Sequence, residues 1–506
     1  MTAWLDRILG RVTMYGLVLI SLAFVGAAAL IGSLLGQISY PVVDILVSAA
    51  VLLVTSYAAN GVVAFLFRVR PQLSSSLITA LLLLFIFAPT LDPAGLAVLA
   101  LAAVLAVATK YLLAVRGRHI FNPAAAAAFI VGAIPPLLGS TFVTWWVGTA
   151  FMLPFTAITA LAILFRTRKL WLGLTFVVVG TLTWCLTFIG TGQPFASGLT
   201  FALLQYPTIF FAGFMLSEPL TLPPRRWQQL LEAVVVGLLF GVAFNFFGLF
   251  SASPQFALIV GNLLAFFFGQ RRGIRLSYLG KKQLTPTSWE FEFEPGHPVR
   301  FTAGQYMELT LPHPRTDARG WRRVFSIASA PGDGSRVRFG IRLPESASSF
   351  KKALLALEPG TKVSATSVGG DFVLPTGDSP LLLVAGGIGI TPYISQLEQL
   401  SASGSKRDVA LVYAISRPDD LAYADLLAKT SCTVTVVSAT KPAKLPKGWT
   451  WVASQRLTTD QLLAAVPDAK SRHTYLSGTP AMVGSLKRAL RRAGARRIHT
   501  DVFIGY

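Results

Sequence analysis

The stretch Leu381–Pro392, LLLVAGGIGITP, decides the fold of the second half of this chain. A short apolar run that can form a buried strand leads directly into a glycine-rich turn, and a helical pattern begins at Thr391. Gly386, Gly387 and Gly389 let the backbone approach a pyrophosphate, whose negative charge is attracted by the N-terminus of the next helix. A tight packing turn would explain the same glycines, so the surrounding sequence has to distinguish the two.

The residues on either side of this stretch predict two small domains. From residue 377 to 506, apolar strands such as DVALVYAIS alternate with helical patterns, which is typical of a parallel α/β domain. From 276 to 376, segments such as FEFEPGHPVRF and RVRFGIRL alternate polar and apolar residues between Gly and Pro turns. This second pattern predicts an antiparallel β-barrel.

A second motif, RVFS at Arg323–Ser326, lies on a predicted strand of the barrel. An arginine, an aromatic ring and a hydroxyl at this spacing can meet the phosphate, the ring face and the N5 edge of a flavin. An ordinary strand with alternating exposed and buried residues would explain the motif equally well.

With GQY (304–306), SSF (348–350), GGDFVLP (369–375), YLSGTPAMV (475–483) and DVFIGY (501–506), residues 276–506 resemble the ferredoxin–NADP reductase superfamily. The resemblance implies that the barrel binds FAD and that the α/β domain binds NAD(P)H, which passes a hydride to the flavin. The site residues that it implies are Arg323, Phe325, Ser326, Ser348 and Ser349 for FAD, Gly386, Gly387, Gly389 and Thr391 for NAD(P)H, and Ser326, Ser477 and Tyr506 for catalysis.

Two of these positions carry alternatives. Many relatives have a cysteine where this chain has Ser477, and a serine should still position the nicotinamide. Some relatives stack an aromatic ring on the flavin where this chain has Tyr506, a part that Phe503 could take.

The choice of coenzyme depends on the ends of two strands. Ser416 and Arg417 follow the second strand of the α/β domain, and Ser438 and Lys441 follow the third. Cations there can bind a 2′-phosphate and favour NADPH. Solvated charges at strand ends are the alternative, which leaves NADH open.

The composition separates the first half of the chain from these domains. The protein has 506 residues, of which 53% are hydrophobic and 13% charged, whereas soluble domains carry about 25% charged residues. We expect residues 1–275 to form a membrane domain of about ten helical spans. The apolar runs lie at 13–37, 42–67, 77–91, 94–115, 121–140, 143–165, 170–190, 201–217, 227–250 and 254–270.

The net charge of +21 does not indicate nucleic-acid binding, because the cations of the first half flank its apolar runs. Loops that carry these cations alternate along the chain with loops that have no Lys or Arg. The loops without Lys or Arg lie at 38–41, 91–93, 141–142, 191–200 and 251–253. The positive-inside rule therefore predicts a protein of the cell (inner) membrane with both termini and the reductase domain in the cytoplasm, and it places the loop 191–200 outside.

Metal-based electron carriers are not expected in this chain. Haem in a membrane reductase needs paired histidines on helices, and the first half has only His119. Cys185 and Cys432 are the only cysteines, which is too few for an iron–sulfur cluster. Cys185 is expected to be a buried core thiol; a metal ligand shared across a homodimer is the alternative.

Three short motifs point to flavin in the membrane domain. FNPA (121–124), SGLT (197–200) and EPLTLPP (218–224), in this order, resemble the B subunit of the sodium-pumping NADH:quinone oxidoreductase (Nqr) and the D subunit of the Rnf complex, over roughly 40–270. The resemblance implies FMN bound through its phosphate to Thr200, in a motif that includes Ser197, after loading by a flavin transferase. It also implies a second flavin, such as riboflavin, near Asn122 and His119.

The chain departs from that pattern at the FMN motif. Leu199 stands where the family has alanine, and the acidic residues that usually precede the motif are absent. A noncovalent flavin is therefore the alternative to attachment at Thr200.

These observations predict a membrane NAD(P)H dehydrogenase. Electrons would pass from cytoplasmic NAD(P)H through FAD and membrane flavin to an acceptor at the outer face. One alternative is an NAD(P)H:quinone oxidoreductase whose acceptor lies within the bilayer. Another is an ion or solute transporter regulated by a redox domain.

Overall fold

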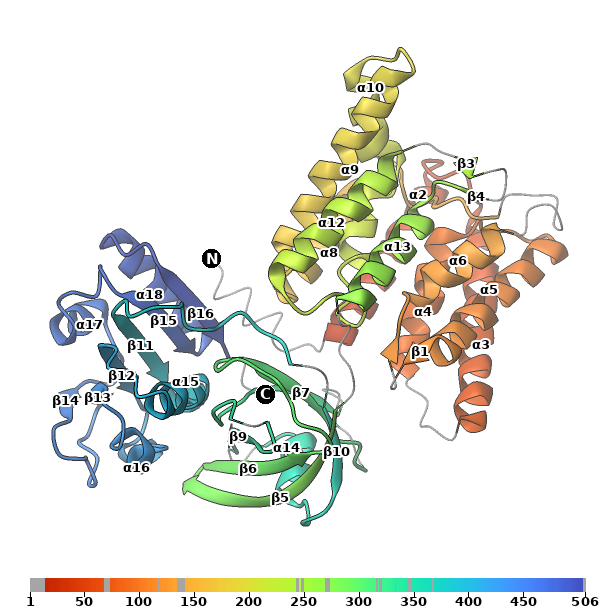
Figure 1. Cartoon of the computed structure of the whole chain (residues 1–506). Helices are drawn as coiled ribbons and strands as arrows, with labels where there is room; N and C mark the ends of the chain where they lie inside the picture. Colours follow the sequence, from red (N-terminus) through yellow and green to blue (C-terminus); the bar gives the residue numbers. More distant parts are fainter. Residues whose placement is uncertain are drawn as a thin grey trace. The chain divides into compact units, whose positions relative to one another are not determined.

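The computed structural model describes residues 14–67, 73–115, 118–133, 142–242, 245–246, 250–268, 274–314, 317, 321–332, 334–343, 347–365 and 368–503. The chain divides into two compact units, with the division between Arg272 and Gly273. The first unit is helical, and the second contains two six-stranded sheets (Figure 1). The limits 1–275, 276–376 and 377–506 for the three domains stay predictions.

The helical unit is built mainly from apolar helices joined by short connections. Its described helices are α2 (Met14–Leu34), α3 (Val42–Leu66), α4 (Leu73–Ile86), α5 (Pro93–Leu112), α6 (Pro123–Gly132), α8 (Leu153–Arg166), α9 (Leu170–Gly190), α10 (Phe195–Thr200), α11 (Thr208–Phe210), α12 (Arg226–Gly241) and α13 (Pro254–Phe267). Two π-helical segments, η1 (Phe201–Gln205) and η2 (Phe211–Met215), flank α11. The short strands are β1 (Ala114–Val115), β2 (Arg118–His119), β3 (Asn245–Phe246) and β4 (Phe250–Ser251).

The prediction of about ten spans is wrong. Among the described residues, four helices are long and apolar enough to cross a membrane: α2, α3, α5 and α9. A fifth candidate is the pair Phe195–Gln205 and Thr208–Met215, which is bent by 58°. The apolar helices α4, α6, α8 and α13 have only 10 to 14 residues, whereas a span needs about 20.

The physical reason for this error is that an apolar run reports composition and not helix continuity. The run 121–140 yields a described helix of only ten residues, Pro123–Gly132, and Pro135 and Pro136 lie outside the described residues. The run 201–217 is broken at Pro207, which cannot donate a backbone hydrogen bond.

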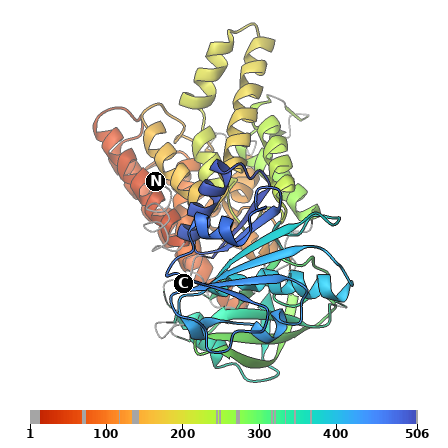
Figure 2. The same ribbon diagram turned by 90° about the vertical axis from the view of Figure 1, so that its left-hand side faces the viewer.

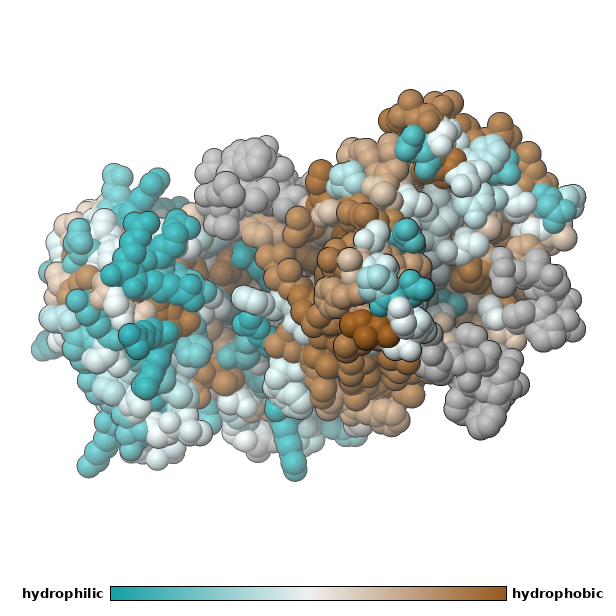
Figure 3. All heavy atoms as spheres, turned by 90° about the horizontal axis from the view of Figure 1, so that it is seen from above, coloured by the Kyte–Doolittle hydropathy of each residue, from teal (hydrophilic) through white to brown (hydrophobic). Residues whose placement is uncertain are grey.

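Large apolar side chains remain exposed on the long helices. Phe65 on α3 is 82% exposed and Leu186 on α9 is 65% exposed. Figure 3 shows hydrophobic residues gathered over this unit. A continuous apolar surface of this kind needs a cover of lipid or protein.

Small residues let α9 and α12 run closely side by side (Figures 1 and 2). A Cβ added at Gly241 on α12 would come within 2.7 Å of Cβ of Thr183 on α9. Gly198 of the SGLT motif makes a similar contact, because its Cβ would lie 2.6 Å from Cα of Cys185. Cys185 is fully buried, as expected for a core thiol. The glycine of the motif therefore has a packing role that is independent of any ligand.

The first sheet of the second unit is antiparallel, as predicted. Its strands are β5 (Ile274–Thr285), β6 (Ser288–Pro295), β7 (Tyr306–Thr310), β8 (Arg322–Ser326), β9 (Val337–Arg342) and β10 (Lys362–Ala365), with the short helix α14 (Ser349–Leu355). Their order is β8-β7-β10-β5-β6-β9. The two edge strands approach each other, because the N–H of Ala328, just after β8, donates to the carbonyl of Arg338 on β9 at 2.8 Å. The sheet thereby curls around an apolar core.

The second sheet is parallel, as predicted. Its strands are β11 (Leu381–Gly386), β12 (Val409–Ala414), β13 (Thr433–Ser438), β14 (Thr450–Ala453), β15 (His473–Gly478) and β16 (Ile498–Val502), in the order β14-β13-β12-β11-β15-β16. The helical segments are α15 (Thr391–Ala402), α16 (Ala424–Leu427), α17 (Thr459–Ala465) and α18 (Pro480–Arg492), with η3 (Gly387–Ile390) and η4 (Pro418–Asp420).

Both faces of this sheet are buried. Leu381 and Leu383 of β11 pack in the core that contains α15, whereas Leu382 and Val384 pack in the core that contains α18. Continuous apolar strands are expected for a parallel sheet that is covered on both sides. The carboxyl end of β11 therefore opens at the edge where parallel sheets bind ligands.

Candidate functional site

The glycine turn after β11 combines an open backbone with one very close contact. Gly387 has a φ of +54°, and a Cβ placed on it would meet no described atom within 4 Å. Gly389 is closely packed instead, because its Cβ would lie 2.7 Å from the carbonyl oxygen of Ser477. The turn thus presents bare backbone at Gly387, as pyrophosphate binding requires. The buried Thr391 begins α15 directly after it.

Ser477 lies on β15, paired with Ala385 of β11, so the structure brings the serine beside the glycine turn. Its side chain is fully buried. Its hydroxyl has no hydrogen-bond partner in the part of the chain that the structure describes. A buried polar group left without a partner is costly. A nicotinamide, whose carboxamide both donates and accepts hydrogen bonds, would satisfy it, and the residues therefore fit NAD(P)H.

In the barrel, β8 places Arg323 and Phe325 on one face of the strand and Ser326 on the other, and both Arg323 and Ser326 are buried. The guanidinium of Arg323 lies 5.4 Å from the ring centre of Phe350 on α14. The half-buried ring of Phe325 packs against the same phenylalanine, with ring centres 5.9 Å apart. The predicted flavin residues therefore converge with the SSF segment on one region of the barrel.

A carboxylate occupies the meeting point of these donors. Oδ1 of Asp317 lies 3.8 Å from Nη2 of Arg323, and Oδ2 accepts the backbone N–H of Ser349 at 2.9 Å. The hydroxyl of Ser349 also bonds Nε2 of His313 at 2.9 Å. Ser348 caps α14 by accepting from the N–H of Lys351. Because the Asp317 carboxylate is an anion held by these groups, the donor set fits the pyrophosphate of FAD.

Asp501, the first residue of DVFIGY, is a further candidate site residue to which the sequence motifs assign no role. It lies on β16, and its carboxylate accepts a hydrogen bond from the hydroxyl of Ser326. Burial and, to a smaller extent, the charge of Asp371 raise the pKa of Asp501 against hydrogen bonds from the Val502 N–H and Ser326, and the net value is about 6. A carboxyl group that titrates near pH 6 can hold or release a proton beside Ser326.

The C-terminal aromatic residues are only partly described. Phe503 follows β16, and its N–H donates to the carbonyl of Gly478 at 2.9 Å, next to Ser477. Tyr506 lies outside the described residues, so its role stays a prediction.

At the coenzyme end of β12, Ser416 and Arg417 are exposed. Arg417 pairs with Asp420, with Nη2 and Oδ1 3.4 Å apart. Ser438, by contrast, is buried and its hydroxyl bonds both the Trp451 indole N–H and the carbonyl of Thr440. Arg417 and Lys441, which is also exposed, are therefore the predicted cations that can reach a ligand from the surface.

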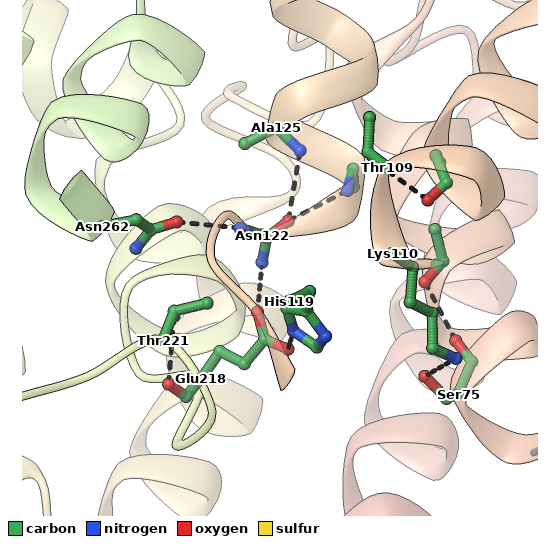
Figure 4. Close-up of polar contacts among 12 residues, drawn as sticks. Ser75, Thr109, Lys110, His119, Asn122, Ala125, Glu218, Thr221 and Asn262 are labelled. Carbon is green, nitrogen blue, oxygen red and sulfur yellow. Dashed lines mark hydrogen bonds and ion pairs between the residues drawn. The ribbon is translucent and has the colours of Figure 1, made fainter. Parts of the chain in front are cut away.

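In the helical unit, His119 and Asn122 belong to a buried polar chain (Figure 4). Nε2 of His119 lies 3.0 Å from Oε1 of Glu218, and the Asn122 amide donates to Oε2 of the same carboxylate at 2.8 Å. The backbone N–H of Asn122 bonds Oδ1 of Asn262 at 2.8 Å. Oδ1 of Asn122 caps α6, accepting from Ala124 and Ala125. Asn122 thus joins the start of α6 both to Asn262 on α13 and to the loop at Glu218.

Thr200 and Ser197 lie on α10, next to the C-terminal end of α9 in Figure 1. The Thr200 side chain is exposed and Ser197 is half-buried. The structure therefore leaves the predicted FMN acceptor accessible, and its modification stays a prediction.

Comparison with known proteins assigns the second unit. Residues 383–488 match the family described as oxidoreductase NAD-binding domain. The chain is 28% identical over 218 residues to the reductase subunit of an aromatic O-demethylase from Amycolatopsis, which covers 41% of this chain and 62% of that protein. It is 30% identical over 204 residues to the electron transfer component of toluate 1,2-dioxygenase from Pseudomonas putida, covering 39% and 56%. It is 32% identical over 149 residues to ferredoxin–NADP reductase B from Sorangium cellulosum, covering 29% and 59%.

The chain spans less than two thirds of the length of each of these relatives. The second unit is an FAD- and NAD(P)H-binding module of the ferredoxin-reductase type. No match to the Nqr B or Rnf D family was found for the helical unit, so that resemblance rests on its motifs.

Proposed function

We propose that the protein is a membrane NAD(P)H dehydrogenase that delivers electrons to an acceptor reached through its helical unit. The observation that carries the proposal is that one chain combines a match to an oxidoreductase NAD-binding domain with four helices, among the described residues, of membrane-spanning length. A soluble reductase has no use for such helices, whereas an enzyme that reduces an acceptor in or across a membrane needs them.

Within the reductase, each part of the site has a separate task. The backbone at Gly387 binds the pyrophosphate of the coenzyme, and Ser477 orients its nicotinamide. Arg323 and the N–H of Ser349 bind the pyrophosphate of FAD. When bound, FAD accepts a hydride from NAD(P)H and can release its electrons singly. Ser326 and Asp501 hold a proton at the edge of that site.

The membrane part of the proposal follows the charge pattern and the motifs. Both termini and the reductase lie on the cytoplasmic side, and α10 lies at the outer side. FMN bound at Thr200 and a second flavin near Asn122 would divide the distance across the bilayer, about 30 Å of hydrocarbon, into shorter steps. Arg417 favours NADPH as the donor.

A second candidate acceptor is a quinone inside the helical unit. The polar chain of His119, Glu218, Asn122 and Asn262 favours it, because all but Glu218 are buried and buried polar groups in a membrane protein often mark functional sites. Such groups could bind and protonate a carbonyl of the acceptor. The outer-face acceptor and the quinone differ in whether electrons leave the membrane.

The flavin content tests the proposal. We expect the purified protein to contain FAD and, after denaturation, a second flavin, either released or fluorescing on the protein band. Thr200→Val should abolish band fluorescence. Thr191→Val is the matched control, because Thr191 is an exposed threonine at the end of α9. FAD as the sole flavin in the wild-type protein would contradict a flavin relay through the helical unit.

A further inference from the structure

The last helix of the reductase unit carries a strongly basic surface. Residues 480–500 contain six Lys or Arg and no Asp or Glu. We call the exposed cations of this segment the α18 basic surface, and they are Arg488, Arg491, Arg492, Arg496 and Arg497. Figure 3 shows hydrophilic residues gathered over the reductase unit.

The fold aligns these cations outward. Val483, Leu486 and Leu490 of α18 are buried in the core beneath the parallel sheet, which fixes the opposite face of the helix toward solvent. Two arginines in the last turn are explained by the helix dipole. The dipole does not explain Arg488 in the preceding turn or Arg496 beyond the helix.

The α18 basic surface is largely uncompensated. In the described ranges, none of Arg488, Arg491, Arg492 and Arg496 forms an ion pair with a carboxylate. Elsewhere in the same domain arginines do have acidic partners, such as Arg472 with Asp408 and Asp468. Self-repulsion among unpaired cations disfavours such a cluster unless an anionic partner offsets it.

The length of the chain between the units indicates what that partner is. Phe267 ends α13 and Ile274 begins β5, so the two residues can be at most about 25 Å apart. If the helical unit is in the membrane, as in the proposed function on which this inference rests, the reductase is held beside the membrane surface. The nearest abundant anions are then lipid phosphates, and each Lys or Arg near an anionic surface adds to the attraction.

We propose that the α18 basic surface binds the anionic headgroups of the membrane that holds the helical unit. Binding would fix the orientation of the reductase on its short connection. An acidic electron-carrier protein is a different partner for the same charge. The lipid is favoured because it is always within reach of this chain.

The test places a fluorophore on α18 in the full-length protein. Ser485 is exposed on this helix, and Ser485→Cys in a Cys432→Ser background gives a labelling site, because the other cysteine, Cys185, is buried. The protein is reconstituted into vesicles of phosphatidylcholine, with or without about one third phosphatidylglycerol. Lipids with a nitroxide headgroup quench the fluorophore when α18 lies at the surface.

We expect quenching in the anionic vesicles, weak quenching in phosphatidylcholine alone, and loss of quenching at about 1 M salt, where the Debye length falls to about 3 Å. The triple variant Arg488→Gln, Arg491→Gln, Arg492→Gln should lower the ratio of bound to detached reductase on the order of 100-fold. The matched control is Lys441→Gln, Lys444→Gln, Lys447→Gln. These three exposed lysines precede β14, at the opposite edge of the sheet from β15 and β16.

Equal quenching in the two lipids, or equal quenching in the arginine and lysine variants, would overturn the proposal. So would an arginine variant that keeps its quenching and loses only binding of an added acidic carrier protein. Failure of the proposed function would give a different result, because alkaline carbonate would then release the protein from the vesicles. A protein that stays inserted while α18 is unquenched contradicts this inference alone.

Discussion

Gly389 lies so close to Ser477 that a Cβ on the glycine would come within 2.7 Å of the serine carbonyl oxygen. This contact joins the glycine turn after β11 to the end of β15, two motifs separated by almost ninety residues. It places the open backbone of Gly387 beside the buried hydroxyl of Ser477. The candidate coenzyme site is therefore a product of close backbone packing between neighbouring strands.

Gly389→Ala should separate coenzyme binding from FAD binding. The added methyl group meets backbone, which has little freedom to move, and overpacking of this kind costs about 1–3 kcal/mol. We expect kcat/KM for NAD(P)H-driven ferricyanide reduction to fall at least about tenfold, with FAD content unchanged. Gly484→Ala is the control, because its Cβ would meet only the Arg488 side chain, at 3.8 Å. Equal loss in both variants would argue against the packing account.

The stability of the reductase unit should depend on the protonation of Asp501. Burial raises its pKa from 3.8 to about 6, so the folded state binds this proton more tightly than the unfolded state. The stabilisation is complete below about pH 4 and is lost as pH rises through about 6, by about 1–3 kcal/mol. The free energy of unfolding, measured against pH, should lose this component in Asp501→Asn. Identical pH profiles for the two proteins would contradict the assignment.

An ion pair joins the barrel to the α/β domain. Nη2 of Arg338 on β9 lies 2.6 Å from both carboxylate oxygens of Glu398 on α15, and Oε2 also accepts the Ala330 N–H at 3.0 Å. Glu398→Ala removes the acceptor of the Ala330 N–H and leaves Arg338 with Glu290 alone, whose Oε2 lies 3.5 Å from Nη1, so we expect the free energy of unfolding to fall by about 1–3 kcal/mol.

The control for this pair is Arg336→Gln. The Arg336 side chain is 67% exposed in its ion pair with Glu292, and exposed pairs contribute at most about 1 kcal/mol. Denaturant unfolding followed by flavin fluorescence measures both variants. Losses of equal size would mean that the Arg338–Glu398 pair has no special role between the domains.

Arg417 should select between the two coenzymes. If its exposed guanidinium binds the 2′-phosphate of NADPH, Arg417→Ala should raise KM for NADPH about tenfold, since a charge-assisted contact contributes about 1.5–3 kcal/mol. KM for NADH should stay the same. Lys447→Ala, an exposed cation before β14, should change neither value. A parallel rise in both KM values for Arg417→Ala would assign the residue to its ion pair with Asp420 instead.

The sequence predicted the reductase unit well because its signals are local. The strand, glycine turn and helix of 381–392 follow one another along the chain, and the alternation in 276–376 has the period of a half-buried strand. Asp501 begins the DVFIGY motif, but nothing local to that motif indicates a role for its carboxylate. Its proposed role depends on contact with Ser326, which is distant in sequence.

The helical unit was harder to predict. Hydropathy identified the long helices α2, α3, α5 and α9, but it counted short helices and the bent segment at Pro207 as full spans. His119 and the EPLTLPP motif that begins at Glu218 are each visible in the sequence. Their contact joins residues 99 positions apart, and no local pattern indicates such a pair.

The most direct test of the central claim is electron transfer across a sealed vesicle. The protein is reconstituted with ferricyanide trapped inside, and NADPH is added outside. We predict that the trapped ferricyanide is reduced by protein molecules whose reductase unit faces the external solution. Gly389→Ala should abolish this reduction. Reduction of external ferricyanide alone, with the trapped pool unchanged, would contradict the claim that electrons pass through the helical unit.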